Sequence, residues 1–165
     1  MLKIQTIMSD PRFKNRMQEI KTAEQDRIYC RHGFEHLLSV ARIAYILAQE
    51  EGEIKIYSKS SFKEIIYATA LLHDIGRFSD YEKTMNHRIA GALLARPILT
   101  DAGFDEGEVD EMCDAIKMHG TFPEEKNSFA GIIYRADKLS RSCFDCDAYD
   151  SCNWSAEKKN DDIEY

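Results

Sequence analysis

The amino-acid sequence predicts an all-α fold, a compact bundle of about six helices followed by a short irregular C-terminal tail. Apolar residues recur at helical spacing over most of the chain, whereas the alternation typical of a β-strand occurs only from Glu53 to Tyr57. Capping side chains also precede several apolar stretches. With 165 residues, 44% of them hydrophobic, the chain can bury one sizeable core, so we expect a single domain, residues 1–165.

Two helices are expected in the first third of the chain. Asp10 can cap the first, and Pro11 can open it, because proline has no N–H to lose at the first helical position. The second helix starts near Arg31 and runs to Gly52, with its apolar residues on one face. This long amphipathic stretch is the clearest helix in the sequence.

Two further helices are expected in the middle of the chain. Ser61 caps the third helix, whose apolar stretch runs into His73 and breaks at Gly76. The fourth helix begins near Asn86 and is interrupted at Pro97, because proline lacks the N–H that would bond to the preceding turn.

The last two helices precede the tail. Asp105 and Glu108 form a capping box before an apolar stripe that Gly120 terminates. Ser128 caps the sixth helix, which reaches Leu139. The remaining residues, from about 142 to 165, are mostly polar and bear cysteines, and we expect them to form the irregular tail.

The composition excludes several classes of function. The formal net charge is −7, so the chain lacks the basic excess of proteins that bind long nucleic acid or anionic membranes. The longest apolar run, residues 65–72, is too short to cross a bilayer, and residues 1–8 are too polar for a signal peptide. We therefore expect a cytoplasmic protein whose five cysteines are thiols or metal ligands. The sequence makes no prediction about the oligomeric state.

Ionisable side chains stand on or beside apolar helix faces at three places. His36 lies within the second helix next to two leucines. His73 and Asp74 end the apolar third helix, and Asp137 follows the apolar stretch of the sixth. A buried charge without a partner is costly, and a divalent cation shared by several helices is one partner that removes the cost. Alternatively, each group is a core residue that is satisfied by a hydrogen bond.

Taken in order, the motifs resemble those of the HD phosphohydrolase superfamily, which is named after the His-Asp dipeptide. The resemblance covers about residues 31–141, the expected metal-binding core. Five segments carry it: residues 36–44 (HLLSVARIA), 71–77 (LLHDIGR), 86–94 (NHRIAGALL), 115–119 (AIKMH) and 135–138 (RADK). It is specific for the fold and the metal site but not for the substrate, because the superfamily supports many reactions on one scaffold.

The resemblance implies a metal ion with four ligands: His36, His73, Asp74 and Asp137. Imidazole and carboxylate ligands suit Mn²⁺, Fe, Co or Zn. His87 and His119 match positions that bind a second ion in two-metal members, with Asp74 as the bridge, and that face the substrate phosphate in one-metal members. Some two-metal members have another histidine directly after the position of His119, where this chain has Gly120. A site with one ion and a site with two ions therefore both remain open.

If a divalent ion binds at this place, we expect hydrolysis of a phosphoester or phosphoanhydride. The ion lowers the pKa of bound water and screens a phosphoryl oxygen. Arg77 and Lys138 are candidates for binding the negative charge of the substrate, or they are solvated surface cations. Asp80 is a candidate proton acceptor for the attacking water, or an ordinary loop carboxylate. His32, one turn before His36, supports the site, contacts the substrate, or is solvated.

The tail carries a second signal. Cys143, Cys146 and Cys152 form a C-x2-C-x5-C pattern, and a C-x2-C pair is a common half of a zinc site. Cys30 or His32 would complete four ligands if the tail folded back toward the start of the second helix. An iron-sulfur cluster, a redox pair and unligated thiols are the competing interpretations. The segment also resembles a cysteine-bearing tail of some small HD proteins.

The sequence therefore predicts a metal-dependent phosphohydrolase that acts on a small phosphorylated substrate, with a nucleotide as the first candidate, through metal-activated water. One alternative is a di-iron oxygenase, a reaction type of a minority of HD proteins, which redox-active iron and oxygen dependence would identify. The other is a noncatalytic regulatory or ligand-binding module whose metal is structural. A decayed site should have lost a ligand, and the four ligand positions are all filled.

Overall fold

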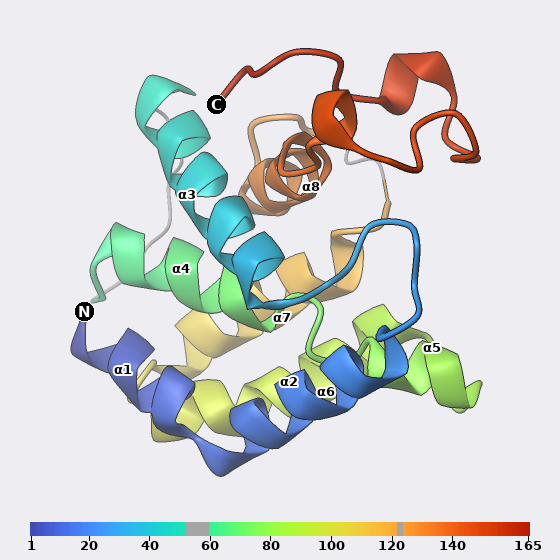
Figure 1. Ribbon diagram of the computed structural model, residues 1–165. Coiled ribbons are helices and arrows are strands. Elements are labelled where there is room, and N and C mark those ends of the chain that lie inside the picture. The colour runs from blue at the N-terminus through green and yellow to red at the C-terminus, as the bar shows by residue number, and fades with distance from the viewer. Residues whose placement is uncertain (52–59, 122–123) are drawn as a thin grey trace.

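The computed structural model describes residues 1–51, 60–121 and 124–165 (Figure 1). Within these ranges it has eight α-helices, two short 3₁₀ turns in the tail and no strand, which confirms the all-α prediction. The helices are α1 (Leu2–Ser9), α2 (Pro11–Ala23), α3 (Phe34–Glu51), α4 (Phe62–Leu72), α5 (Phe78–Glu82), α6 (His87–Asp101), α7 (Glu106–Met118) and α8 (Phe129–Leu139). The expected helix end at Gly52 and the alternation from Glu53 to Tyr57 lie outside the described residues.

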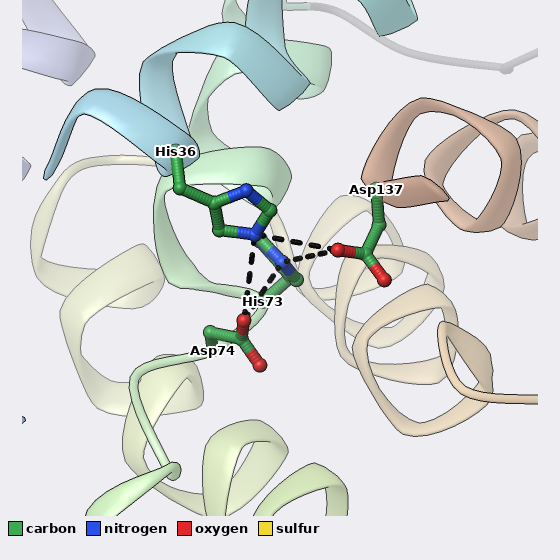
Figure 2. A group of neighbouring side chains, drawn as sticks. All are labelled: His36, His73, Asp74 and Asp137. Carbon is green, nitrogen blue, oxygen red and sulfur yellow. Dashed lines mark ion pairs between the residues drawn. The ribbon is translucent and has the colours of Figure 1, made fainter. Parts of the chain in front are cut away.

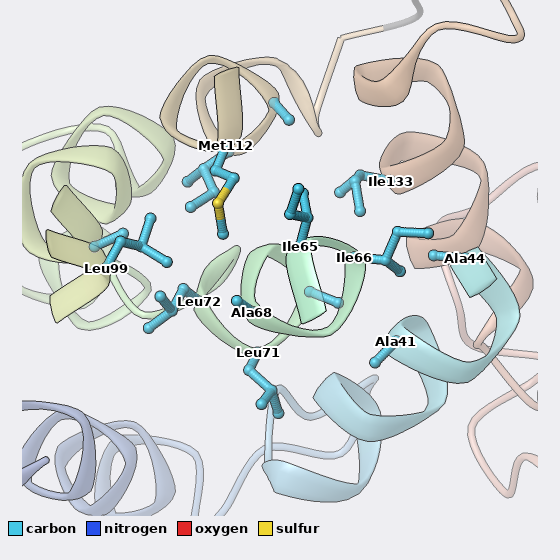
Figure 3. Close-up of a cluster of buried hydrophobic side chains, with 14 of the residues drawn as sticks. Ala41, Ala44, Ile65, Ile66, Ala68, Leu71, Leu72, Leu99, Met112 and Ile133 are labelled. Carbon is cyan, nitrogen blue, oxygen red and sulfur yellow. The ribbon is translucent and has the colours of Figure 1, made fainter. Parts of the chain in front are cut away.

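Helix α4 forms the centre of the bundle. Seven of its eleven residues are buried, so it is apolar on nearly all sides, as a fully buried helix must be. Figure 3 shows its side chains radiating toward α3, α6, α7 and α8, with Ile66 beside α3 and Leu72 beside α6. The end of this helix, where His73 and Asp74 follow, is therefore fixed inside the core.

The expected capping residues start their helices. Asp10 accepts a hydrogen bond from the N–H of the second residue of α2, and Ser61 and Ser128 each accept one from the N–H three residues on. Asp105 and Glu108 form the predicted capping box at the start of α7. Local start signals were therefore reliable, because each acts within a single turn.

Two predicted helix boundaries were wrong. Helix α3 starts at Phe34 rather than near Arg31, because the backbone N–H of His32 donates to the Glu24 carboxylate and holds this stretch in a loop. Helix α6 continues through Pro97 to Asp101. Pro97 lies on the exposed face, where water can bond to the carbonyl that proline leaves without a partner, while the buried residues after it anchor the helix.

The sequence analysis missed α1 and α5. Helix α1 has 8 residues and α5 has 5, which is too short for an apolar repeat to become visible. Ile4 and Ile7 of α1 are nevertheless buried in the core. Among the described residues, no helix is both long enough and apolar enough to cross a lipid bilayer.

The C-terminal tail folds back over the end of α8 and the loop before α3, as the red and blue segments show in Figure 1. The Asn160 amide donates to the carbonyls of Lys138 and Arg141, at 2.9 and 2.7 Å. The Tyr29 hydroxyl donates to the Ser151 carbonyl at 3.1 Å. These bonds fix the tail beside the last turn of α8.

Candidate metal centre

Four predicted ligand side chains meet at one point. His36 comes from the first turn of α3, His73 and Asp74 directly follow α4, and Asp137 lies in the last turn of α8 (Figure 2). Their ligand atoms all lie within 4.8 Å of one another. The Nε2 atom of His36 is 3.3 Å from Asp137 Oδ1, and that of His73 is 3.2 Å from Asp74 Oδ2. The side chains are buried, His73 completely.

Hydrogen bonds at the outer side of both histidines fix which ring nitrogen faces this point. His73 Nδ1 donates to the Ala70 carbonyl at 2.6 Å. Ser140 donates its one hydroxyl hydrogen to the Asp137 carbonyl, so its oxygen accepts from His36 Nδ1 at 3.0 Å. In its neutral form, each ring therefore directs the lone pair of Nε2 inward, as a metal ligand requires.

Two buried acceptors at this point have no hydrogen-bond partner among the described residues: His73 Nε2 and Asp74 Oδ1. A buried acceptor without a donor destabilises the fold. A bound cation satisfies such atoms without needing a donor. Two imidazoles and two carboxylates also form a ligand set suited to divalent transition metals, so the residues fit the metal ion implied by the sequence.

The electrostatics of the site favour a positive charge. Burial raises the pKa of Asp74, but His73 and hydrogen bonds from neighbouring histidines hold it well below its usual value. Burial lowers the pKa of His73, but Asp74 and Asp137 raise it to about 10. The two carboxylates therefore attract a proton or a metal ion, and metal binding would release that proton.

A second group of ligand atoms shares Asp74. Its Oδ1 atom lies 3.5 Å from His119 Nε2 and 3.8 Å from His87 Nε2, and the three ligand atoms lie within 4.8 Å of one another. His119 Nδ1 donates to the Ile116 carbonyl at 2.7 Å, so this ring too presents Nε2. The two oxygens of Asp74 thus face different histidine pairs, which is the arrangement of a bridging carboxylate.

Two carboxylates outside these ligand groups each fix the orientation of one histidine: Glu24 holds His32, and Asp80 holds His87. Glu24 accepts the backbone N–H of His32 at 2.7 Å and its Nδ1–H at 2.5 Å. Asp80 accepts the backbone N–H of His87 at 2.9 Å and contacts its Nδ1 at 2.5 Å. Burial raises the pKa of Glu24, but the two hydrogen bonds from His32 and one from Tyr81 lower it to about 2. Both histidines therefore turn Nε2 toward the site.

Arg77 lies between the two held histidines. Its NH2 group is 2.5 Å from His32 Nε2, and its NH1 group is 3.3 Å from His87 Nδ1. Its Nε atom is 4.0 Å from Asp74 Oδ1. The side chain is largely buried, so its surroundings are not those of a solvated surface cation.

The other predicted substrate-binding and catalytic residues lie close to the ligands. Lys138 Nζ is 2.6 Å from Asp137 Oδ2 and is partly exposed. Asp80 uses one oxygen on the backbone of His87, and the other contacts the His87 ring and Arg77. Its role as a proton acceptor stays a prediction, since the contacts show only that it orients these two side chains.

The sequence analysis missed three residues of the site. Glu24 holds His32, Ser140 fixes His36, and Arg141 places NH2 3.2 Å from both His36 Nε2 and Asp137 Oδ1. Ser140 and Arg141 follow Asp137 by three and four residues on or just beyond α8, and this spacing was an available signal. No such signal existed for Glu24, because a loop connects it to His32 and no helical spacing relates the two residues.

A cavity of about 350 Å³ opens onto the two ligand groups. We call it the metal-centre cavity. Its described lining includes Asp74, Arg77, His87, Asp137 and Lys138, together with residues of the loop before α3 and of the tail. This volume is typical of sites for small molecules.

The tail cysteines do not form the predicted four-ligand site in the described part of the chain. Cys30, Cys143, Cys146 and Cys152 are free thiols and line one cavity of about 450 Å³. The described groups of three or more side chains close enough to share a metal ion contain only histidine and aspartate. The tail does fold back toward Cys30 as expected, but the sulfur atoms do not converge.

The chain is similar in sequence to several known proteins. Residues 33–142 match the family model of the HD domain. An uncharacterized protein of Clostridium beijerinckii is 39% identical over 96% of both chains. Ribonuclease Y of Mesoplasma florum is 31% identical over 107 residues, which are 65% of this chain but 18% of that protein.

A solved structure has a similar fold. It is the crystal structure of a predicted HD superfamily hydrolase from an uncultured Thermotogales bacterium. The TM-score is 0.57 at 25% identity, and the match covers 90% of this chain and 82% of the other.

Proposed function

This chain belongs to the HD domain family, and from this premise we propose that it is a metal-dependent phosphohydrolase acting on a small phosphorylated substrate, with a nucleotide as the first candidate. One observation carries the proposal. Two buried atoms, His73 Nε2 and Asp74 Oδ1, lack hydrogen-bond partners among the described residues, and Asp74 lines a small cavity together with three cationic side chains, Arg77, Lys138 and Arg141.

The ligands would hold one or two divalent ions. His36, His73, Asp74 and Asp137 form the first group, and Asp74 with His87 and His119 forms the second. Such an ion would lower the pKa of coordinated water to about 7 and stabilise charge on a phosphoryl oxygen. The tail cysteines contribute no ligand to either group.

The remaining side chains would bind and orient the substrate. Arg77 and Lys138 offer N–H donors to phosphoryl oxygens next to the ligand groups, and Arg141 adds a third cation. His32 acts through Arg77, whose guanidinium it contacts. We assign Asp80 to orienting His87 and retain it as the candidate proton acceptor.

The net charge of the chain and the volume of the metal-centre cavity support a small substrate. The name ribonuclease Y refers to a much longer relative, of which this chain matches about a fifth. The present chain has a net charge of −7 and a cavity of about 350 Å³. A long nucleic acid would meet repulsion over most of the surface.

Removal of the metal tests the proposal. The protein is purified without added metal, its element content is measured, and phosphate release is followed on a panel of nucleotides and simple phosphoesters. We expect a chelator to lower the rate to about a tenth or less, and Mn²⁺ to restore it. Negligible phosphate release from every substrate with Mn²⁺ present, equal to that of Asp74→Ala, would refute hydrolysis.

The same experiment separates two other functions. A di-iron oxygenase of the HD type would contain iron and consume oxygen, and the two ligand groups joined at Asp74 are compatible with two irons. A noncatalytic module would contain metal but release no phosphate and consume no oxygen.

Replacing Glu24 by glutamine should lower kcat/KM about 10- to 100-fold without removing the metal. A glutamine amide presents a donor to one of the two N–H groups of His32 that now donate to Glu24, so the ring loses its fixed orientation against Arg77. The measurement is steady-state kinetics together with the element content.

Glu19→Gln is the matched control, because Glu19 belongs to α2, the helix that Glu24 directly follows, but pairs with Arg16 at the surface. We expect this variant to retain normal kinetics. Equal kinetics for the two variants would show that the orientation of His32 is irrelevant to the reaction.

A further inference from the structure

The metal-centre cavity has two walls of different origin. One wall comes from the stretch that matches the HD model, residues 33–142, and contains the ligands with Arg77, Lys138 and Arg141. The other comes from residues 27–32 and 152–154, which lie outside that stretch. The second wall includes two aromatic side chains, Tyr29 and Trp154.

We propose that Tyr29 and Trp154 form a subsite for a planar aromatic group of the substrate, while the wall from residues 33–142 binds its phosphate. The inference rests on the proposed phosphohydrolase function and adds how the substrate is selected. An aromatic face stacks on any flat ring and thereby favours substrates that carry one, independently of hydrogen bonding.

The charges divide as this assignment requires. Lys138 and Arg141 contact Asp137, and Arg77 lies near Asp74, so these cations stand at the metal side. Of the described lining residues, those of the tail carry no charge: Cys152, Asn153 and Trp154. Arg27 belongs to the second wall, but its Nε donates to the Cys30 carbonyl and supports the loop.

The aromatic wall is already in place. Tyr29 and the tail are joined by the bond from the Tyr29 hydroxyl to the Ser151 carbonyl. The tail is in turn attached to α8 by Asn160, and Lys159 Nζ donates to the Tyr149 carbonyl at 2.7 Å. A preformed wall costs little conformational entropy when a ligand binds.

The size of the cavity also calls for more than a phosphate. A phosphate ion has the bulk of a few water molecules, each about 30 Å³, and the cavity measures about 350 Å³. Trp154 is half-buried and lines both this cavity and the neighbouring one that the tail cysteines line. The space beside it can therefore accept a ring without displacing the core.

A matched pair of phosphonates tests the subsite. Benzylphosphonate and cyclohexylmethylphosphonate share one carbon skeleton, but only the first is planar, and their C–P bonds resist hydrolysis. Calorimetric titration of the metal-loaded protein should show benzylphosphonate binding about 5- to 100-fold more tightly, the range expected for one stacked ring. Trp154 is the single tryptophan, so benzylphosphonate should also quench the protein fluorescence while inorganic phosphate does not.

Substitutions of tail residues test whether Trp154 causes the preference for the planar ring. Trp154→Ala should bind the two phosphonates equally, and Trp154→Phe should retain most of the preference. Phe144→Ala is the control, because Phe144 is an exposed aromatic residue of the same tail and does not line the cavity. We expect it to behave like the unaltered protein.

The outcomes for binding and for hydrolysis are independent. Equal affinity for the two phosphonates, no binding of either, or a preference that persists in Trp154→Ala would each overturn the subsite, even if phosphate release were confirmed. A planar preference that Trp154→Ala abolishes would support the subsite even in a protein that released no phosphate.

Discussion

Replacing Asp74 by asparagine is expected to lower kcat/KM for phosphate release by about a thousandfold or more, because a catalytic metal ion contributes several kcal/mol to the stabilisation of the transition state. Asp74 belongs to both ligand groups. Asparagine has the same shape but no negative charge, and its amide hydrogens would point at histidine nitrogens that should be metal ligands. Kinetics and element content, measured on one preparation, check both consequences.

The matched control is Asp114→Asn. Asp114 is exposed on α7 and pairs with the nearby Lys117, so the change should leave kinetics and metal content as they were. Circular dichroism should show the same helix content in both variants. An Asp74→Asn protein that keeps its metal and its rate would remove Asp74 from the centre of the reaction.

Replacing Gly76 by alanine is expected to cost about 3 kcal/mol of unfolding free energy or more, because overpacking against fixed backbone cannot be relieved by a side-chain rotation. A Cβ atom at this position would lie 2.2 Å from the His87 carbonyl oxygen and 2.3 Å from the backbone nitrogen of Gly91. Helix α6 would have to move away from the turn that follows α4, and His87 would move with it.

Thermal unfolding measures this effect, with an expected fall in Tm of roughly 6–12 °C. Gly107→Ala is the control. Its Cβ would come no closer than 3.7 Å to an atom of Asp105, and alanine in a helix is more favourable than glycine, so Tm should stay or rise slightly. Equal stability of the two variants would contradict the close packing of α4 against α6.

The close approach at Gly76 also explains part of the sequence motif. Within the segment LLHDIGR, the glycine is the residue that lets the turn after α4 touch the backbone of α6. Gly91 lies on the opposite side of the same contact, with a Cβ position 3.3 Å from the His73 carbonyl oxygen. The motif therefore specifies the packing of two helices as well as two ligands.

Much of the fold could be predicted from the sequence because its signals are local. Ser61, Asp105 and Ser128 each cap a helix through a bond within one turn. Pro97 was misjudged because its effect depends on which face of α6 it occupies, and that is set by the packing of the whole bundle. The start of α3 was misplaced because the backbone N–H of His32 donates to the carboxylate of Glu24, eight residues earlier, and this bond holds the loop before α3.

The candidate ligand set came from the resemblance to the HD superfamily, and the apolar surroundings of its members pointed the same way. A charged or imidazole side chain on an apolar face is costly, so His36, His73 and Asp137 were conspicuous in the sequence. The supporting residues Glu24 and Ser140 are polar residues at helix ends, where such residues are common, and only the tertiary contacts reveal their roles. The cysteine spacing left several interpretations open, because a short pattern fixes neighbours in the chain but not the distances between distant sulfur atoms.

The two walls of the metal-centre cavity have a consequence for how such a protein can diversify. Residues that would perform the bond-breaking step lie within the stretch that matches the HD model, and the other lining residues lie before or after that stretch in the sequence. Mutations that accumulate outside the stretch can therefore alter which compound is accepted while the reactive apparatus is inherited intact. Duplicated copies of such a gene would be free to specialise by changes in these flanking segments.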